Sequence, residues 1–298
     1  MLVAVAGSSG LIGSELLPRL RRADHQVLRL VRRRASSPDE VSWNPAAGTV
    51  DLDALAGVEA IVNLAGANVG GRRWTESYKQ TLYTSHVASA RVLAATAAEL
   101  ADSVRTLVSV GAMGYYGNDT GGVRLTESAP PGSDYLAHLV ADKEVATEPA
   151  ASAGVRVVLP RISLVMGAGG GALGARMLPL SKVGLLGPLA GGDTTWSVVS
   201  VQDAARALLH MLEDFSISGP VNVSAPETTT NAEFTRLLGK QVHRPAILPV
   251  PKFGLKIVLG DLADEMLADF DVDPGKLLAS GFTFEHPDAA SIIEAATR

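Results

Sequence analysis

The chain has 298 residues, of which 47% are hydrophobic and 19% charged, and its formal net charge at pH 7 is −5. This balance is typical of a globular protein near the size at which one core begins to divide, and it favours neither nucleic acid nor an anionic membrane as a partner. The absence of cysteine excludes a thiolate nucleophile, a zinc–thiolate site and a disulfide, and it fits a cytoplasmic location.

A glycine-rich turn follows the first predicted strand, Leu2–Ala6. Gly7 permits a tight turn, Gly10 lets the backbone approach a pyrophosphate, and Gly13 lets the next helix pack close to the strand. The N-terminal N–H groups and the dipole of that helix, predicted over residues 14–22, would point at the phosphate. A strand before the glycines and a helix after them predict a dinucleotide site, with an ordinary glycine-rich turn as the alternative.

The second predicted strand, Gln26–Val31, ends in the run Arg32-Arg33-Arg34. A site for NAD usually has Asp or Glu at this strand end for the ribose 2′-hydroxyl, whereas a site for NADP has Arg for the 2′-phosphate. No acid lies here, and a guanidinium can bind the phosphate in a bidentate manner. We therefore predict NADP(H) as the cofactor, with Arg32 as the leading contact and Arg33 as the second. The alternative is a solvated basic turn.

Apolar and helical segments continue to alternate up to about residue 165. They predict a helical connection at 53–57, strands at 60–64, 105–110 and 155–159, and helices at 75–100 and 136–153, the last interrupted near Pro149. Strands that alternate with helices and are apolar on both faces predict a Rossmann-like, doubly wound parallel α/β sheet. We expect no signal peptide, since the N-terminus lacks a basic region, and no membrane span.

The sequence after the last of these strands is rich in glycine and proline and then helical. We expect an NADP-binding Rossmann domain over residues 1–166, to which residues 197–225 return, and a smaller, mainly helical substrate-binding lobe over residues 167–298. Because ligands of such sheets bind at the carboxyl ends of the strands, this lobe is expected to carry substrate contacts.

Several short motifs occur in a specific order along the whole chain. They are Asn63-Leu64-Ala65-Gly66, Arg72-Arg73-Trp74, Gly114-Tyr115-Tyr116-Gly117, Gly169-Gly170-Gly171, Met177-Leu178-Pro179, Asn231-Ala232-Glu233-Phe234 and His243-Arg244-Pro245-Ala246. With the glycine turn and the basic strand end, they resemble an atypical group of the extended short-chain dehydrogenases/reductases. This group is the epimerase family whose members are often named nucleoside-diphosphate sugar epimerases.

The resemblance implies cofactor contacts from the glycine turn and from the ends of several strands. The implied set is Gly7, Ser9, Gly10, Leu11, Ile12, Gly13, Arg32, Arg33, Leu64, Ala65, Gly66, His86 and Val165. In this set Val165 would lie near the nicotinamide. His86 occupies a place where relatives often have an Arg that reaches the cofactor phosphates, so a purely structural role is its alternative.

The usual acid–base residues of this superfamily are a Tyr, a Lys one helical turn later and a Ser or Thr on the preceding strand. Lys143 lies in the expected helix, but Leu139 occupies the place of the Tyr, and the hydroxyl position falls at Gly111 or Ala112. The usual set is therefore incomplete in this chain.

Tyr115 and Tyr116 lie in the loop after the strand at 105–110, where either can donate a proton. With Lys143 they form the predicted catalytic set, and the alternative is that both tyrosines anchor the loop. The scattered histidines show no paired spacing, so we predict no metal. We expect an NADP(H)-dependent oxidoreductase or epimerase, monomeric or homodimeric, that acts on a small polar substrate, with a nucleotide sugar as one candidate. The alternative is a catalytically inactive NADP(H)-binding regulator or sensor.

Overall fold

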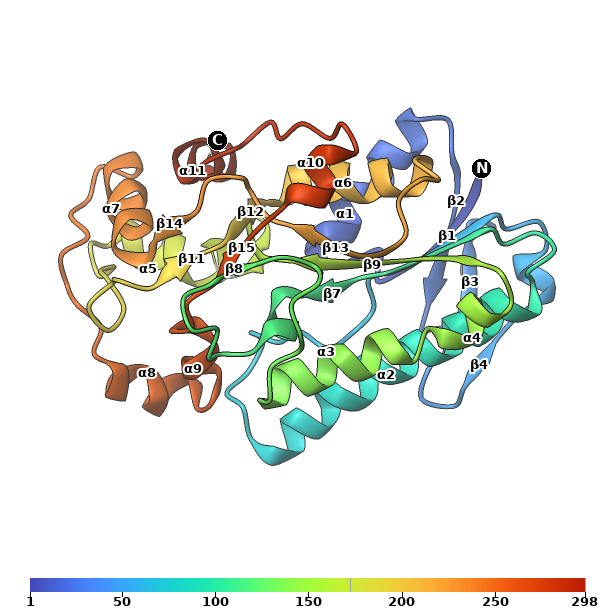
Figure 1. Cartoon of the computed structure of the whole chain (residues 1–298), viewed down its shortest axis with the longest axis horizontal. Helices are drawn as coiled ribbons and strands as arrows, with labels where there is room; N and C mark the ends of the chain where they lie inside the picture. The colour runs from blue at the N-terminus through green and yellow to red at the C-terminus, as the bar shows by residue number, and fades with distance from the viewer. Residues whose placement is uncertain (172, 298) are drawn as a thin grey trace.

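The computed structural model describes residues 1–171 and 173–297, and a nine-stranded sheet forms its centre (Figure 1). The strand order is β13-β9-β6-β5-β1-β2-β3-β4, and β7 also pairs with β9. The strands are β1 Leu2–Ala6, β2 Gln26–Val31, β3 Glu40–Asn44, β4 Thr49–Val50, β5 Ala60–Asn63, β6 Thr106–Ser109, β7 Gly111–Ala112, β9 Arg156–Ile162 and β13 Gly219–Val223. All neighbours pair in parallel except β3 and β4, which confirms the predicted doubly wound α/β sheet.

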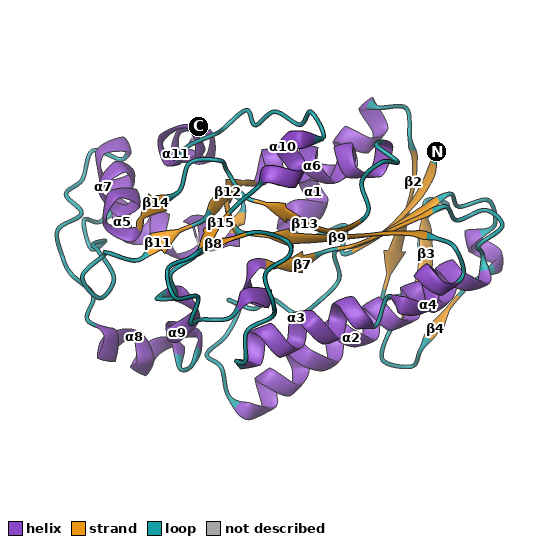
Figure 2. Cartoon of the chain, in the orientation of Figure 1, coloured by secondary structure: helices purple, strands orange, loops and turns teal. Residues whose placement is uncertain are grey.

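Helices cover both faces of this sheet (Figure 2). One face packs against α1 Leu11–Arg22, α6 Val201–Glu213 and α10 Gly275–Ala279, and the other against α2 Glu76–Glu99, α3 Tyr135–Val145 and α4 Glu148–Ser152. The sheet strands are apolar on both faces because both faces are buried in this way. Among the described residues, no helix combines the length and the apolar character that crossing a bilayer requires.

The remaining elements gather beyond one end of the sheet, on the left in Figure 1. The helices there are α5 Leu178–Lys182, α7 Asn231–Gln241, α8 Lys252–Leu259, α9 Leu262–Met266 and α11 Ala289–Thr297. Three small two-stranded sheets join them, formed by β10 Leu164–Gly167 with β12 Val198–Ser200, β11 Thr195–Trp196 with β14 Thr229–Thr230, and β8 Arg124–Leu125 with β15 Asp271–Val272. Short helical turns are η1 Asp53–Leu55, η2 Met113–Tyr116 and η3 Leu173–Met177. The domain boundary at residues 166–167 stays a prediction.

Two strands differ from the sequence-based expectation for identifiable reasons. The segment predicted to end at residue 159 continues to Ile162, because Pro160 is tolerated inside β9. The pairing of β9 with β6 ends at Val158 and its pairing with β7 begins at Arg161, so Pro160 lies where this ladder is interrupted and needs no N–H donor. The short β3 was not predicted, although its alternation of buried Val41 and Trp43 with exposed residues is typical of a strand.

Candidate functional site

A cavity of about 700 Å³ opens at the carboxyl ends of β1, β2 and β5, where a doubly wound sheet holds its ligand. Its walls are formed by Gly7, Ser8, Ser9, Gly10, Arg29, Leu30, Val31, Arg32, Arg33, Trp43, Pro45, Leu64, Ala65, Gly66, Ser85 and Ser89. Most of the cofactor contacts expected from the sequence therefore lie together on one surface. The volume is within the range that accommodates cofactors, about 300–1,000 Å³.

The glycine turn brings backbone atoms so close together that side chains are excluded. Gly7 has φ of 78°, and a Cβ atom on it would lie 2.6 Å from the carbonyl carbon and oxygen of Leu64. A Cβ atom on Gly13 would lie 2.4 Å from the carbonyl oxygen of Gly7. Gly10 is the N-cap of α1 and has no side chain to occupy the first N–H groups of the helix. These groups are therefore free to bind an anion.

Three of the expected contacts lie behind the turn rather than on the cavity wall. Ile12 packs into the core between α1 and the sheet, and Gly13 is buried. Leu11 lies under a glycine-rich segment, since a Cβ atom on Gly171 would be 3.1 Å from Leu11 Cδ2. A cofactor role for these three residues stays a prediction.

The arginines at the end of β2 differ in their ion pairs. Arg33 donates to both oxygens of Glu40, at 2.7 and 2.5 Å, and Arg29 lies 2.9 Å from the same carboxylate while donating to Asp39 at 3.0 Å. The hydrogen bonds from Arg33 lower the pKa of Glu40 to about 2. Arg32 is exposed and has no ion-pair partner among the described residues. Arg32 is therefore the free cation on the cavity wall, whereas Arg33 is already engaged.

A buried chain of polar contacts runs behind the cavity from Lys143 to His86. Lys143 is only 3% exposed, and its Nζ lies 3.5 Å from both the Ala65 carbonyl oxygen and His86 Nδ1. His86 Nε2 lies 3.0 Å from the Ala67 carbonyl oxygen, so Nε2 carries the hydrogen and Nδ1 accepts from the ammonium. Burial lowers the pKa of Lys143 to about 8, and burial together with Lys143 lowers the pKa of His86 to about 4. His86 is therefore neutral at pH 7.

Two serines that flank His86 on α2 were not predicted as part of the site. Ser85 Oγ accepts from the Ala67 N–H at 3.0 Å, and Ser89 Oγ donates to the Ala65 carbonyl oxygen at 3.2 Å. Both serines line the cavity. Their spacing of one helical turn places them on one face of α2, which is the signal that could have identified them.

The two predicted tyrosines pack around Arg161. The buried Tyr116 donates its hydroxyl hydrogen to Asn222 Oδ1 at 2.6 Å and accepts from Arg161 Nη1 at 3.2 Å, and burial raises its pKa. The Arg161 guanidinium lies 3.3 Å from the ring centre of Tyr115. Neither tyrosine is among the residues that line the cavities described here. This geometry favours the alternative in which both anchor the loop.

A second, smaller cavity of about 210 Å³ lies between the sheet and the C-terminal helices. It is lined by Val69, Ala112, Met113, Gly114, Leu136, Ile162, Ser163, Leu164, Val165, Trp196, Ser197, Leu262, Glu265, Met266, Ala268 and Phe270. Val165, the residue expected beside the nicotinamide, is thus part of its wall. Among the residues that line this cavity, Glu265 alone has an ionisable side chain. Burial and, to a smaller extent, Asp134 raise the pKa of Glu265 to about 8.

Glu265→Gln is expected to change how the stability of the protein depends on pH. Because the carboxyl pKa is about 8 in the folded chain and 4.5 ordinarily, the folded state keeps a proton that the unfolded state loses. The free energy of unfolding of the natural chain therefore falls as the pH rises between these values. The free energy of unfolding of the Gln variant, relative to that of the natural chain, should rise by about 2–5 kcal/mol from about pH 5 to about pH 9. Urea unfolding at several pH values measures this, and a difference independent of pH would contradict a buried neutral carboxyl.

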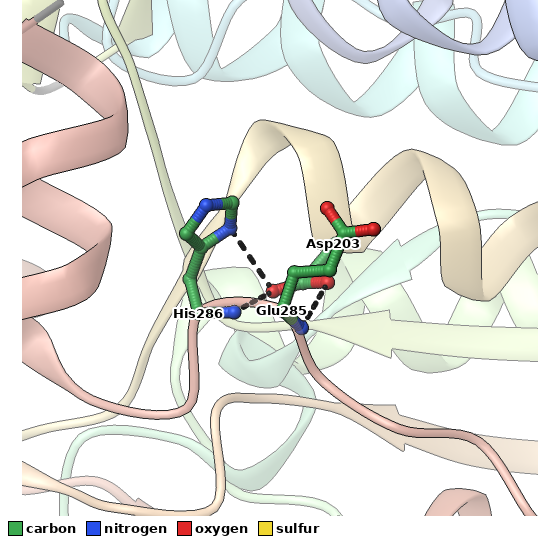
Figure 3. A group of neighbouring side chains, drawn as sticks. All are labelled: Asp203, Glu285 and His286. Atoms are coloured by element: carbon green, nitrogen blue, oxygen red, sulfur yellow. Dashed lines mark hydrogen bonds and ion pairs between the residues drawn. The ribbon is translucent and has the colours of Figure 1, made fainter.

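A third group of side chains, Asp203, Glu285 and His286, has the proximity of a metal site, since its ligand atoms lie within 4.8 Å of one another. Figure 3 shows the Asp203 carboxylate accepting from the backbone N–H groups of Glu285 at 3.0 Å and His286 at 2.8 Å. The same carboxylate accepts from Ser200 and pairs with Arg206. These contacts indicate that Asp203 tethers the chain at residues 285–286. Ser200 caps α6, and its hydroxyl oxygen accepts from the Asp203 N–H.

Comparisons with known proteins agree with this architecture. Residues 3–224 match the NAD dependent epimerase/dehydratase family, and residues 250–296 match a domain of unknown function, DUF1731. The chain is 42% identical to the epimerase family protein Mb2239 of Mycobacterium bovis, covering 99% of this chain and 97% of that protein. It is 30% identical to the human epimerase family protein SDR39U1, covering 99% of both.

Solved structures show the same likeness. The crystal structure of human SDR39U1 with NADPH has a TM-score of 0.89 at 29% identity, with 99% of both chains covered. The nucleoside-diphosphate sugar epimerase from Corynebacterium glutamicum has a TM-score of 0.80 at 31% identity, and the match covers 99% of this chain but 58% of that one. The glycine turn, the parallel sheet and these full-length similarities show that the chain belongs to the NAD-dependent epimerase/dehydratase family.

Proposed function

We propose that the protein is an NADP(H)-dependent oxidoreductase or epimerase acting on a small molecule. The observation that carries the proposal is the position of Arg32, an unpaired guanidinium on the same cavity wall as the glycine turn. A dinucleotide with an additional 2′-phosphate needs both features. The similarity to human SDR39U1, whose structure contains NADPH, supports the choice of cofactor. Bound NADP(H) would supply the hydride chemistry.

The residues present fit such a cofactor. The turn at Gly7 and Gly10 and the N–H groups at the start of α1 would hold the pyrophosphate, because both glycines line the cavity and the N-cap Gly10 has no side chain to occupy these groups. Arg32 would hold the 2′-phosphate. Ala65 and Gly66 would lie beside the adenosine and its ribose.

Lys143 is a positioning residue in this proposal. Its ammonium is buried and has two acceptors at 3.5 Å, both at the limit of hydrogen-bond distance. A further acceptor, such as a cofactor hydroxyl, stabilises a buried cation whose existing hydrogen bonds are long. The neutral His86 does not supply the charge that an arginine has in relatives. Its contribution is to hold Lys143 against the loop at residues 65–67.

Arg32→Ala is expected to weaken NADPH binding by about 10- to 100-fold and to leave NADH binding unchanged. The reason is that a charge-assisted hydrogen bond to phosphate contributes about 1.5–3 kcal/mol, and NADH lacks that phosphate. Fluorescence titration of both nucleotides measures the effect.

Arg34→Ala is the matched control, because Arg34 is a neighbouring exposed arginine that does not line the larger cavity. It should leave both affinities unchanged. Equal affinities of the natural chain for NADPH and NADH, both insensitive to Arg32→Ala, would contradict the assignment of the 2′-phosphate.

The alternative is a protein that binds NADP(H) as a sensor without turnover. Leu139 is 1% exposed in the core at the place of the usual catalytic Tyr, and the Tyr116 hydroxyl is engaged elsewhere, which favours this alternative. Tight NADPH binding without oxidation by any tested carbonyl compound is its expected result.

A further inference from the structure

We infer that the cavity beside Val165 is the substrate pocket, that it takes a small, uncharged and mainly apolar carbonyl or carbinol compound, and that Glu265 exchanges the proton with the oxygen of that compound. The inference rests on the proposed function, because it requires NADP(H) in the larger cavity with its nicotinamide beside Val165. It names the substrate class and the proton donor, which the cofactor site leaves open.

The location of the pocket fits a substrate site. One wall comes from the ends of sheet strands, with Ala112 on β7 and Ile162 on β9, and the opposite wall comes from α9 and the segment that follows it. The pocket therefore lies where the C-terminal helices meet the carboxyl end of the sheet. This is the crevice in which doubly wound folds bind ligands.

The size and lining of the pocket restrict the substrate. Its volume of about 210 Å³ is below the range of about 300–1,000 Å³ of pockets that take drug-sized ligands. Aliphatic, aromatic and methionine side chains form most of the wall, and no Lys, Arg or His is among these residues. A nucleotide sugar would leave its diphosphate without a cation and would exceed this volume. The polar substrate expected from the sequence is therefore not the one that this pocket favours.

Among the polar side chains of this wall, Glu265 keeps a carboxyl oxygen, Oε2, that has no hydrogen-bond partner among the described residues, whereas Trp196 Nε1 donates to the Met266 carbonyl oxygen at 3.4 Å. Ser163 Oγ already donates to the Val223 carbonyl oxygen at 3.0 Å. Ser197 Oγ donates to the Phe270 carbonyl oxygen at 2.9 Å and accepts from the Val272 N–H at 2.8 Å. Both hydroxyls are thus engaged in holding the fold together.

The surroundings of Glu265 keep its carboxyl protonated. Asn118 Nδ2 donates to Glu265 Oε1 at 3.2 Å, which lowers the pKa of the carboxyl. Burial opposes this effect, and so do the carboxylates of Asp134, on the N-cap of α3, and Asp264, on the same helix. The neighbouring Lys256 is paired with Asp264 at 3.0 Å. Burial and these carboxylates raise the pKa of Glu265 to about 8, so at pH 7 it is a neutral acid that an apolar pocket tolerates and that can donate a proton.

The reaction balances with NADPH as the reductant and with solvent as the final source of the proton. With NADPH bound as the two-electron reductant, the substrate carbonyl carbon would gain a hydride and its oxygen would gain the Glu265 proton, which converts the carbonyl to a carbinol. The Glu265 carboxylate then recovers a proton from water. In the opposite direction the carboxylate accepts the hydroxyl proton.

A binding experiment on the NADPH-saturated protein tests the substrate class. Cyclohexanone and benzaldehyde are the neutral probes and UDP-glucose is the charged one, each followed by saturation-transfer NMR. We expect the neutral probes to bind and UDP-glucose neither to bind nor to displace them. Displacement by UDP-glucose, or no binding of either neutral probe, would overturn the inference. Failure to bind NADPH would instead overturn the proposed function, so the two failures are distinguishable.

A pair of variants tests the proton donor. Glu265→Gln should bind NADPH and cyclohexanone as the natural chain does, but should reduce the ketone about 10²- to 10⁴-fold more slowly. It should also lose the infrared carbonyl band of a protonated carboxyl that titrates near pH 8. Glu227→Gln, at an exposed glutamate of the same lobe, should change none of these.

The natural chain provides a second readout, to be compared with that of Glu265→Gln because the pKa of Lys143 is also about 8. Its rate of ketone reduction should fall as the pH rises through about 8, because Glu265 then loses the proton that it must donate. An unchanged rate in Glu265→Gln, or a flat profile through this range, would remove Glu265 from the reaction.

Discussion

Gly7→Ala is expected to lower the free energy of unfolding by about 2–5 kcal/mol and to abolish measurable NADPH binding. The backbone at Gly7 has φ of 78°, which alone disfavours an alanine. In addition, the new Cβ atom would lie 2.6 Å from the carbonyl carbon and oxygen of Leu64, which belong to backbone that has no freedom to rotate away. The turn and the end of β5 would have to separate, and both line the cofactor cavity. Urea unfolding and fluorescence titration measure the two effects.

Gly154→Ala is a control that has the backbone strain of an alanine at positive φ but no clash of the added Cβ atom with neighbouring backbone. Gly154 has φ of 82°, nearly the same conformation, but nothing lies within 4 Å of an added Cβ atom. This control should cost about 1–2 kcal/mol and leave NADPH affinity unchanged. Equal losses of stability in the two variants would mean that the contact with Leu64 is unimportant.

Arg161→Leu is expected to cost about 3–5 kcal/mol, because it leaves the carboxylate of Glu144, whose side chain is only 13% exposed, without its partner. Arg161 is 2% exposed and donates to both oxygens of Glu144, at 2.8 and 2.9 Å. It also donates to the carbonyl oxygen of Glu127 at 3.2 Å and lies against the ring of Tyr115. The loop that carries the tyrosines should therefore loosen as well. Chemical denaturation gives the cost.

The double variant Arg161→Leu/Glu144→Leu is the decisive comparison. Removing both charges leaves no unpaired ion in the core, so the double variant should recover part of the stability that the single variant loses. A double variant less stable than Arg161→Leu would show that the ion pair itself, rather than the unpaired carboxylate, dominates the cost.

The parts of the site that could be predicted from the sequence are those whose geometry is set by residues nearby in the chain. The glycine turn is such a case, because the constraints at Gly7 and Gly13 come from a strand and a helix that directly adjoin them. The basic end of β2 was identified for the same reason. Arg32 was placed before Arg33, but the ion pair of Arg33 was not predicted, since the carboxylate that engages it belongs to β3, a strand that the sequence pattern did not reveal.

The substrate pocket depends on contacts between distant segments, which no local pattern encodes. Glu265 lies in a five-residue helix, and the Asn118 amide that binds it is 147 positions away in the sequence. Its environment arises only when the C-terminal helices pack on the sheet. The tyrosines show the converse, since their position in a loop suggested access to substrate, whereas the buried Arg161 holds them.

The tether at Asp203 has a consequence for local opening of the protein. Through the backbone N–H groups of residues 285–286 it fixes the segment that leads into α11, and α11 packs on β10 and β12. Val165 on β10 is part of the wall of the smaller cavity. Fraying of the last helix and exposure of this wall therefore belong to one cooperative unit, so amide hydrogens in both should exchange with solvent at a common rate.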